Sequence, residues 1–502
     1  MATILRPGGG VEESDALNPH HNVRSLSGHD HARGLSVAVT LMMVAVVGGG
    51  CRRDEAQTAS ASKELHGVVL ILLDTVRADH LSCYGYDRKT SPNMDALAEQ
   101  GVHFKQVVAP SPWTLPSVGA MLTAEYPERG FAQAGKLSWS LVEHFRRAGL
   151  STAGITEGGY VSRAFGIDRG FGHYVEEKGP VQLLKPGERP DPNAHGDIQN
   201  TFALARQWLV EHRDERFFLF IHTYEPHTPY TRRDFARTMD AGAVGPVFTI
   251  EFLRPLQTGE IVLSDAEVEY VKALYDGGIL HADRHVGAFV SFLEAVGLKD
   301  RTLVVVTSDH GEELNDHYPG NTGDHGHSLR DPLLLVPLIL YNPLQRYPVS
   351  EVVAQVRLID VMPTIAELLG VPIDRPIDGK SLIPLMTGAE TENRLALTAH
   401  SKKGPPRIGI RHGGFKYVTS TGNDVSYPKL SPAPPPRQLY DLTADPLEKT
   451  NLAAVKPELA AVMSKALEDA YASFAKPVKF TTPDVADQAL RERLKSLGYV
   501  GD

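Results

Sequence analysis

Three apolar runs in this sequence are each followed by side chains that commonly hold metal ions or move protons. The runs and the residues that follow them are 68–73 with Asp74, 217–221 with His222 and the nearby His227, and 303–306 with Asp309 and His310. A single aspartate after a strand is usually a turn or a helix cap. Carboxylates and imidazoles after three separate runs are harder to explain as caps, so we interpret them as parts of one metal-binding or catalytic site.

The apolar runs have the character of strands buried on both faces, because their hydrophobic residues are continuous rather than alternating. Residues 93–100, 141–148, 201–211 and 265–296 predict helices that alternate with these strands. Alternating strands and helices predict an α/β fold around a mostly parallel sheet. Ligands of such sheets bind beyond the carboxyl ends of the strands, so the three sets of residues should meet at one edge.

The character of the sequence changes after about residue 390. Residues 407–418 predict a hairpin with a glycine-rich turn, and residues 457–474 predict a helix. We therefore expect a catalytic domain over residues 65–390, followed by a small α+β subdomain with a short antiparallel sheet over residues 391–502.

Composition excludes several classes of protein. The chain has 502 residues, of which 42% are hydrophobic, and can bury a large core. Its formal net charge is -10 and it has no long run of lysine or arginine, which argues against nucleic acid as a partner. Any anionic substrate must therefore meet a local positive site. The two cysteines, Cys51 and Cys83, exclude a disulfide framework.

The first 51 residues have the pattern of an export leader. Residues 35–47 are mostly apolar, follow Arg33 and precede three glycines and Cys51; this run is shorter than the roughly 20 residues that span a bilayer. The leader resembles a bacterial lipoprotein signal peptide with Cys51 as the lipidated residue, and a plain secretory signal or short anchor is the alternative. Residues 52–64 predict a polar tether. We expect an exported protein of the periplasm or cell envelope, attached to the membrane if Cys51 is lipidated.

Six blocks, in order along the chain, resemble the sulfatase family of the alkaline phosphatase superfamily. They are ILLDTVRADHLSCYGY (71–86), SPWTLPSVGAMLT (111–123), FLFIHTYEPHTPY (218–230), TSDHGE (307–312), GDHGHSLRDPLLLVP (323–337) and LYDLTADPLEKTNL (439–452). The resemblance implies an alkaline-phosphatase-like sandwich, with a large, mostly parallel central sheet flanked by helices. It also implies a metal-dependent hydrolase of sulfuric or phosphoric esters, acting on a small anionic substrate.

The resemblance further implies a metal ion held by Asp74, Asp309 and His310, with Thr114 as a further ligand. Such an ion polarises the ester and stabilises charge on its oxygens. A ligand set rich in oxygen favours calcium, magnesium or manganese, and the histidine ligand is also compatible with zinc.

The expected nucleophile departs from the family pattern. Most sulfatases carry Cys or Ser in a Cys/Ser-x-Pro-x-Arg motif, where that residue is converted to formylglycine, whereas residues 114–118 here read Thr-Leu-Pro-Ser-Val. Formylglycine chemistry is therefore not expected. Threonine at this position resembles the phosphatase branch of the superfamily, in which a metal-activated hydroxyl attacks phosphorus. We predict Thr114 as the nucleophile.

The substrate side of the site is predicted from four residues. His227 matches a family histidine that hydrogen-bonds the ester or protonates the leaving group. His325 and His327 lie in a glycine-containing loop and can bind the anion or a second metal. Arg77 can meet an anion or pair with Asp79.

Three other functions compete with a sulfatase. A phosphoesterase or phosphonate hydrolase is consistent with a threonine at the position of the nucleophile. An envelope phosphoryl-substituent transferase uses related chemistry, but proteins of that class typically carry several membrane helices. A catalytically silent binding protein would explain Val118 in place of the motif arginine. Retention of the three metal-type ligands and Thr114 favours an enzyme, so an exported hydrolase leads.

Overall fold

The computed structural model describes residues 64–131, 135–177, 197–399, 401–422, 435–474 and 487–497. Residues 62–502 form one compact unit. The predicted leader, Cys51 and almost all of the tether lie outside the described residues. Within the described ranges, no helix combines the length and apolar character that crossing a bilayer requires.

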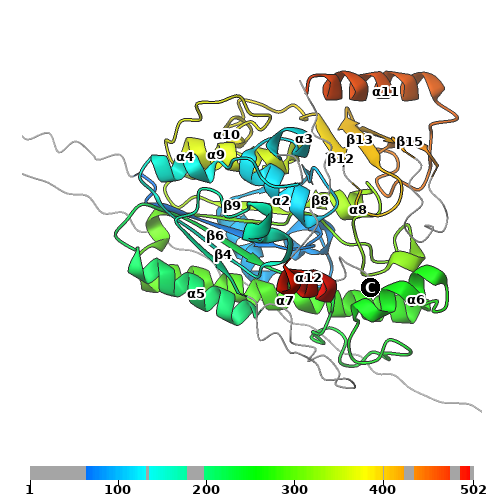
Figure 1. Ribbon diagram of the computed structural model, residues 1–502, viewed down its shortest axis with the longest axis horizontal. Coiled ribbons are helices and arrows are strands. Elements are labelled where there is room, and N and C mark those ends of the chain that lie inside the picture. The colour runs from blue at the N-terminus through cyan, green and yellow to red at the C-terminus, as the bar shows by residue number, and fades with distance from the viewer. Residues whose placement is uncertain are drawn as a thin grey trace, which may run out of the picture. The chain divides into compact units, whose positions relative to one another are not determined.

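An eight-stranded sheet forms the centre of the molecule (Figure 1). Its strands, in spatial order, are β10 (Glu351–Val352), β2 (Val102–Phe104), β9 (Leu338–Tyr341), β7 (Thr302–Thr307), β1 (Gly67–Leu73), β6 (Phe217–Thr223), β4 (Ser151–Thr156) and β5 (His173–Glu176). β9 is antiparallel to both of its neighbours, and every other pairing in this sheet is parallel. The prediction of a mostly parallel sheet is confirmed.

The continuous apolar character of β1 follows from its central position. Successive side chains of a strand point to opposite faces. Val68, Leu70 and Leu72 therefore pack into one hydrophobic core, and the alternate residues Val69 and Ile71 pack into the other. Both faces are covered, so every position of the strand must be hydrophobic.

Helices cover both faces of the sheet (Figure 1). They are α1 (Pro92–Gln100), α2 (Thr114–Thr123), α3 (Pro127–Gly130), α4 (Val142–Arg147), α5 (Ile198–Glu211), α6 (Leu253–Thr258), α7 (Asp265–Ala295), α8 (Asp331–Leu334), α9 (Val361–Leu368), α10 (Ile383–Met386), α11 (Pro457–Ala472) and α12 (Gln488–Ser496). Buried residues of α1, α5 and α7 pack in one core, and those of α2, α4, α9 and α12 pack in the other. The predicted helices correspond to α1, α4, α5, α7 and α11, with ends that differ by a few residues.

Two smaller sheets complete the fold. One has three strands, β11 (Val356–Arg357), β3 (Val107–Val108) and β8 (Leu335–Val336). The other is antiparallel, with β12 (Ala396–Ala399), β13 (Arg407–His412), β14 (Phe415–Ser420) and β15 (Arg437–Asp441) in sequence order. The hairpin predicted over residues 407–418 is β13 and β14. The antiparallel sheet predicted for the C-terminal part is confirmed, whereas the domain boundary near residue 390 stays a prediction.

Candidate active site

The residues that follow the central strands meet at one edge of the sheet. Parallel pairing sets the carboxyl ends of β1, β6 and β7 level with one another. Asp74, Asp309 and His310 are buried there, and each offers one ligand atom within 4.8 Å of the others. The structure thus brings together the three residues that were expected to hold a metal ion.

Thr114 is the first residue of α2 and points at this cluster. Its Oγ1 donates to Asp74 Oδ2 at 3.3 Å and lies 3.2 Å from His310 Nε2. Ser117, one turn further along α2, donates from Oγ to the backbone oxygen of Asp309 at 2.6 Å and fixes the helix start against the end of β7. The positive end of the helix dipole therefore lies at the Thr114 hydroxyl, where it favours a negatively charged oxygen.

The orientation of the His310 ring fits a metal ligand. Its Nδ1 lies 2.9 Å from the carbonyl oxygen of Gly311, and a carbonyl only accepts, so Nδ1 carries the proton. Nε2, on the other side of the ring, faces Asp74 Oδ1 at 3.6 Å and Asp309 Oδ2 at 3.4 Å. Metal-binding histidines commonly donate their second ring nitrogen to a carbonyl in this way.

The carboxylates also fit a cation. Asp74 Oδ1 and both carboxylate oxygens of Asp309 are buried and have no hydrogen-bond partner among the residues that the structure describes. Burial, and next the nearby Asp309, raise the pKa of Asp74 well above its usual value. A divalent cation would compensate both costs, because it supplies positive charge and accepts lone pairs from these oxygens.

His222 supports the cluster from behind. Its Nε2 lies 3.1 Å from Asp74 Oδ2. Burial lowers the pKa of His222 to about 4, so the neutral ring donates from Nε2 to the carboxylate and orients it. The sequence predicts His222 as part of the site from its place at a strand end, and the contact with Asp74 gives it a positioning role.

The turn after β1 is held in a strained conformation. Thr75 has φ 61°, a left-handed value that is rare for a β-branched residue. Tyr275 Oη donates to the Thr75 carbonyl at 2.8 Å. Ser308 Oγ accepts from the Val76 amide at 3.0 Å and donates to the His310 carbonyl at 2.8 Å. These bonds join the turns after β1 and β7, so Asp74 and His310 keep their relative position.

His227 and His325 lie beside the cluster, as expected. The ring centres of His325 and His310 are 4.4 Å apart, and those of His325 and His227 are 5.0 Å apart. His227 Nδ1 lies 2.7 Å from the Thr228 carbonyl, and burial lowers the pKa of His227 to about 3. Neutral His227 therefore carries its proton on Nδ1 and has a lone pair on Nε2. His325 Nδ1 is 3.0 Å from Glu312 Oε1.

The other two predicted substrate residues are placed differently. His327 is buried with its ring against Tyr318 and its Nε2 3.8 Å from Glu313 Oε2. The Arg77 guanidinium points its N–H groups at Asp79, at Asp316 and at a backbone carbonyl. These acceptors engage all five of its donors. Pairing with Asp79, the alternative to anion binding, is therefore the arrangement that the structure shows.

Two lysines that the sequence reasoning missed approach the histidine side of the site. They lie between β12 and β13. Lys403 forms an ion pair with Asp324, next to His325. Lys402 Nζ lies 4.6 Å from the ring centre of Tyr160 and 5.4 Å from that of Trp113, the residue before Thr114. Neither lysine belongs to a motif that the sequence analysis identified. The acidic net charge indicated only that an anionic substrate needs some local positive site, and it did not say which residues form that site.

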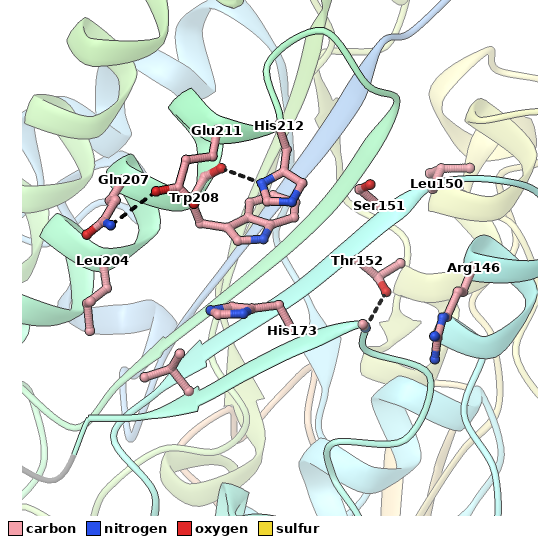
Figure 2. Close-up of a pocket in the computed structure, with 12 residues that line it drawn as sticks. Arg146, Leu150, Ser151, Thr152, His173, Leu204, Gln207, Trp208, Glu211 and His212 are labelled. Atoms are coloured by element: carbon pink, nitrogen blue, oxygen red, sulfur yellow. Dashed lines mark hydrogen bonds between the residues drawn. The ribbon is translucent and has the colours of Figure 1, made fainter.

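A separate pocket of about 530 Å³ lies away from these residues. Figure 2 shows Trp208 stacked on His212, with ring centres 4.3 Å apart, beside Ser151 and Thr152. Ser151 begins β4, so the pocket lies at the amino end of a parallel strand. Asp74 and Asp309 follow the carboxyl ends of such strands, so the pocket and the candidate site lie at opposite edges of the sheet.

Comparisons with known proteins agree with this geometry. The sulfatase family model matches residues 66–371. A choline-sulfatase of Rhizobium meliloti is 28% identical, covering 77% of this chain and 82% of its own length. An N-acetylgalactosamine-6-O-sulfatase of Bacteroides thetaiotaomicron is 23% identical over 84% of this chain and 96% of its own length. The phosphonate monoester hydrolase of Agrobacterium radiobacter has a similar structure, with a TM-score of 0.63, 22% identity and coverage of 81% of this chain and 96% of its own.

Proposed function

Because the chain belongs to the sulfatase family of ester hydrolases, we propose that it cleaves a small anionic sulfate or phosphorus ester with Thr114 as the nucleophile. The observation that carries this proposal is the place of Thr114 Oγ1. It lies at the positive end of α2, within 3.3 Å of Asp74 Oδ2 and His310 Nε2.

Asp74, Asp309, His310 and Thr114 would hold a divalent metal ion. When bound, this ion supplies positive charge that lowers the pKa of the Thr114 hydroxyl and stabilises negative charge on the ester oxygens. Hard oxygen ligands favour calcium, magnesium or manganese, and the imidazole is compatible with zinc.

In the first step, Thr114 Oγ1 releases its proton to water and attacks the sulfur or phosphorus atom. A bond forms from Oγ1 to that atom, and the bond to the leaving-group oxygen breaks. That oxygen departs with the electron pair and takes up a proton from water on the side where His325 lies. Covalent catalysis of this kind divides one difficult displacement into two easier ones.

In the second step, water attacks the same sulfur or phosphorus atom. The lone pair on Nε2 of neutral His227 takes a proton from this water. The bond to Thr114 Oγ1 then breaks, and the proton returns to Thr114. We therefore propose that His227 acts as a base toward water rather than as the acid that protonates the leaving group. The reason is that its proton lies on Nδ1, so Nε2 accepts a proton and does not donate one.

The alternatives rest on specific observations. The structural likeness to a phosphonate monoester hydrolase and the threonine nucleophile favour phosphorus esters, whereas the sulfatase relatives favour sulfate esters. A silent binding protein is disfavoured, because a binding protein has no need for Thr114 Oγ1 and the three candidate ligand residues to lie together.

We test the proposal with matched aryl sulfate, phosphate, phosphodiester and phosphonate monoester substrates and purified protein loaded with calcium, magnesium, manganese or zinc. Turnover of one or more of these esters that Thr114→Ala abolishes supports the proposal. Turnover that survives in Thr114→Ala contradicts the threonine mechanism. Binding without turnover under every metal would favour the silent binding protein.

Export is proposed from the sequence of the leader alone. We propose a periplasmic or envelope location, with Cys51 as a lipid attachment site. Cell fractionation and labelling with a radioactive fatty acid test this, because Cys51→Ala should abolish labelling. Labelling that persists in the variant, or protein found only in the cytoplasm, contradicts it.

A further inference from the structure

The C-terminal helix α12 (Figure 1, red) packs into the same hydrophobic core as α2, the helix that begins at Thr114. Leu490, Leu494 and Leu497 are buried in the same core as α2 and one face of the central sheet. A Cβ atom on Gly159 would lie 2.9 Å from Leu497 Cδ1 and 2.7 Å from Tyr224 Oη. The end of α12 and Tyr224, which follows β6, therefore meet without spare room.

Arg493 of α12 reaches toward Tyr224, and two of its guanidinium nitrogens are unsatisfied within the described part of the chain. Its central carbon lies 5.8 Å from the Tyr224 ring centre. Its Nε and Nη2 are buried and have no hydrogen-bond partner among the described residues. Contact with an aromatic ring stabilises a cation, but buried N–H donors without an acceptor are costly. The protein thus keeps a buried cation with two nitrogens, Nε and Nη2, that lack acceptors among the described residues.

Tyr224 separates Arg493 from the reacting centre by one layer of side chains. The Tyr224 ring is nearly perpendicular to His222 at 4.6 Å and to His227 at 5.6 Å. His222 in turn contacts Asp74. Arg493 therefore lies on the histidine side of the site, displaced from the position beside Thr114 where the ester group itself must bind.

Glu157 is a nearby acidic group that could compensate Arg493, but it already has other partners. Its carboxyl oxygens accept from the Tyr224 amide at 2.9 Å and from Thr201 Oγ1 at 3.3 Å. Burial also raises the pKa of Glu157 to about 8, so this carboxyl is largely neutral at pH 7. The charge of Arg493 remains available to a ligand.

We propose that Arg493 binds an anionic group carried by the leaving-group part of the substrate. This inference rests on the proposed ester hydrolysis and specifies its substrate class: an ester whose leaving group has its own carboxylate or similar oxyanion. The guanidinium offers two buried donors to such a group in a forked geometry. Arg493 is then a specificity-determining residue, supplied by the end of the chain to a site built on the central strands.

The experiment uses the metal-loaded full-length protein and two aryl esters that differ by one carboxylate on the leaving-group ring. Wild-type protein should prefer the carboxylated ester in kcat/KM by about tenfold or more, as a charged hydrogen bond in a buried site allows. Arg493→Met removes the charge but keeps the apolar stem. It should lose this preference through a higher KM for the carboxylated ester, with the plain ester unchanged. Added methylguanidinium should restore part of the preference.

Arg206 provides a matched control. This arginine of α5 lies 5.8 Å from the Phe292 ring centre and also has a buried Nε without a partner among the described residues. It packs on a helix of the opposite core. Arg206→Met should therefore leave the preference between the two esters intact.

Equal loss on both esters in Arg493→Met, or no preference in the wild type, would overturn the inference. If the wild type hydrolyses neither ester, the proposed function is contradicted, but the role of Arg493 can still be tested by measuring ligand binding with calorimetry. Benzoate should then bind wild-type protein more tightly than Arg493→Met, while benzyl alcohol should bind both equally. Equal binding of benzoate would overturn the inference.

Discussion

At the scale of single residues, partners distant in sequence decide which polar side chains remain available to a substrate. Asp74, Asp309 and His310 were predictable, because each follows a buried strand and parallel strands end at one edge. The engagement of Arg77 by Asp316 was not predictable, since Asp316 lies in a loop 239 positions away. The same holds for His327, whose neighbours are set by tertiary folding alone.

His325 should matter more as the leaving group becomes poorer. A proton supplied to the departing oxygen helps an alkoxide more than a nitrophenolate, which is stable without one. His325→Ala should therefore lower kcat/KM about a hundredfold for an alkyl ester and much less for a nitrophenyl ester. Steady-state kinetics on a series of leaving groups measures this difference. A uniform loss across the series would remove His325 from the leaving-group side.

Glu157 should make stability depend on pH. Its folded pKa of about 8 lies above its usual value of 4.5, so its neutral form stabilises the fold fully below pH 4.5. This contribution is lost as the pH rises through about 8. The loss amounts to about 5 kcal/mol at most, from 3.5 pKa units. Urea unfolding of wild type and Glu157→Gln from pH 5 to pH 9 should show a smaller decline in the variant. Parallel curves would contradict the buried neutral carboxyl.

At the scale of elements, long regular patterns were predictable, whereas helix α2, which begins at Thr114, was not. β1 and α7 have continuous or periodic apolar residues, which identify them directly. α2 contains Pro116 and Gly119, which argue against a helix. Pro116 is tolerated because it lies in the first turn, where amide groups have no partner within the helix. Gly119 is required by packing, because a Cβ there would lie 2.2 Å from Phe131 Cζ.

Gly119→Ala should displace α2 and with it Thr114, the proposed nucleophile. The added methyl group overlaps the Phe131 ring, and overpacking of this kind typically costs about 1–3 kcal/mol. We expect a lower unfolding free energy together with a lower kcat. Gly172→Ala is the control, since its nearest neighbour would be Thr152 O at an ordinary 3.5 Å. If both variants behave like the wild type, the packing argument for α2 is wrong.

At the scale of the whole molecule, the central sheet supplies the ligands and the last quarter of the chain supplies positive charge. The sequence predicted the central sheet and the C-terminal antiparallel sheet separately. It did not predict that Lys402 and Arg493 approach the histidine side of the site. No local pattern encodes such approaches, because they depend on how the cores pack.

Metal binding should couple to global stability. Asp74 and Asp309 are fully buried side by side, and a cation that joins them relieves their mutual repulsion. Treatment with a chelator should therefore lower the melting temperature, and the preferred divalent ion should restore it. Asp309→Asn, which removes one charge, should show a smaller response. Identical melting curves with and without the chelator would contradict a metal site here.

The central claim is that Thr114 itself carries the transferred group. Rapid-quench mass spectrometry of the metal-loaded protein during turnover tests it most directly. The peptide that contains Thr114 should gain the mass of one sulfuryl or phosphoryl group, or of the substituted phosphoryl group if the substrate is a phosphonate, and lose it as substrate runs out. An unmodified Thr114 peptide during active turnover, with hydrolysis persisting in Thr114→Ala, would show that water attacks directly and would contradict the account.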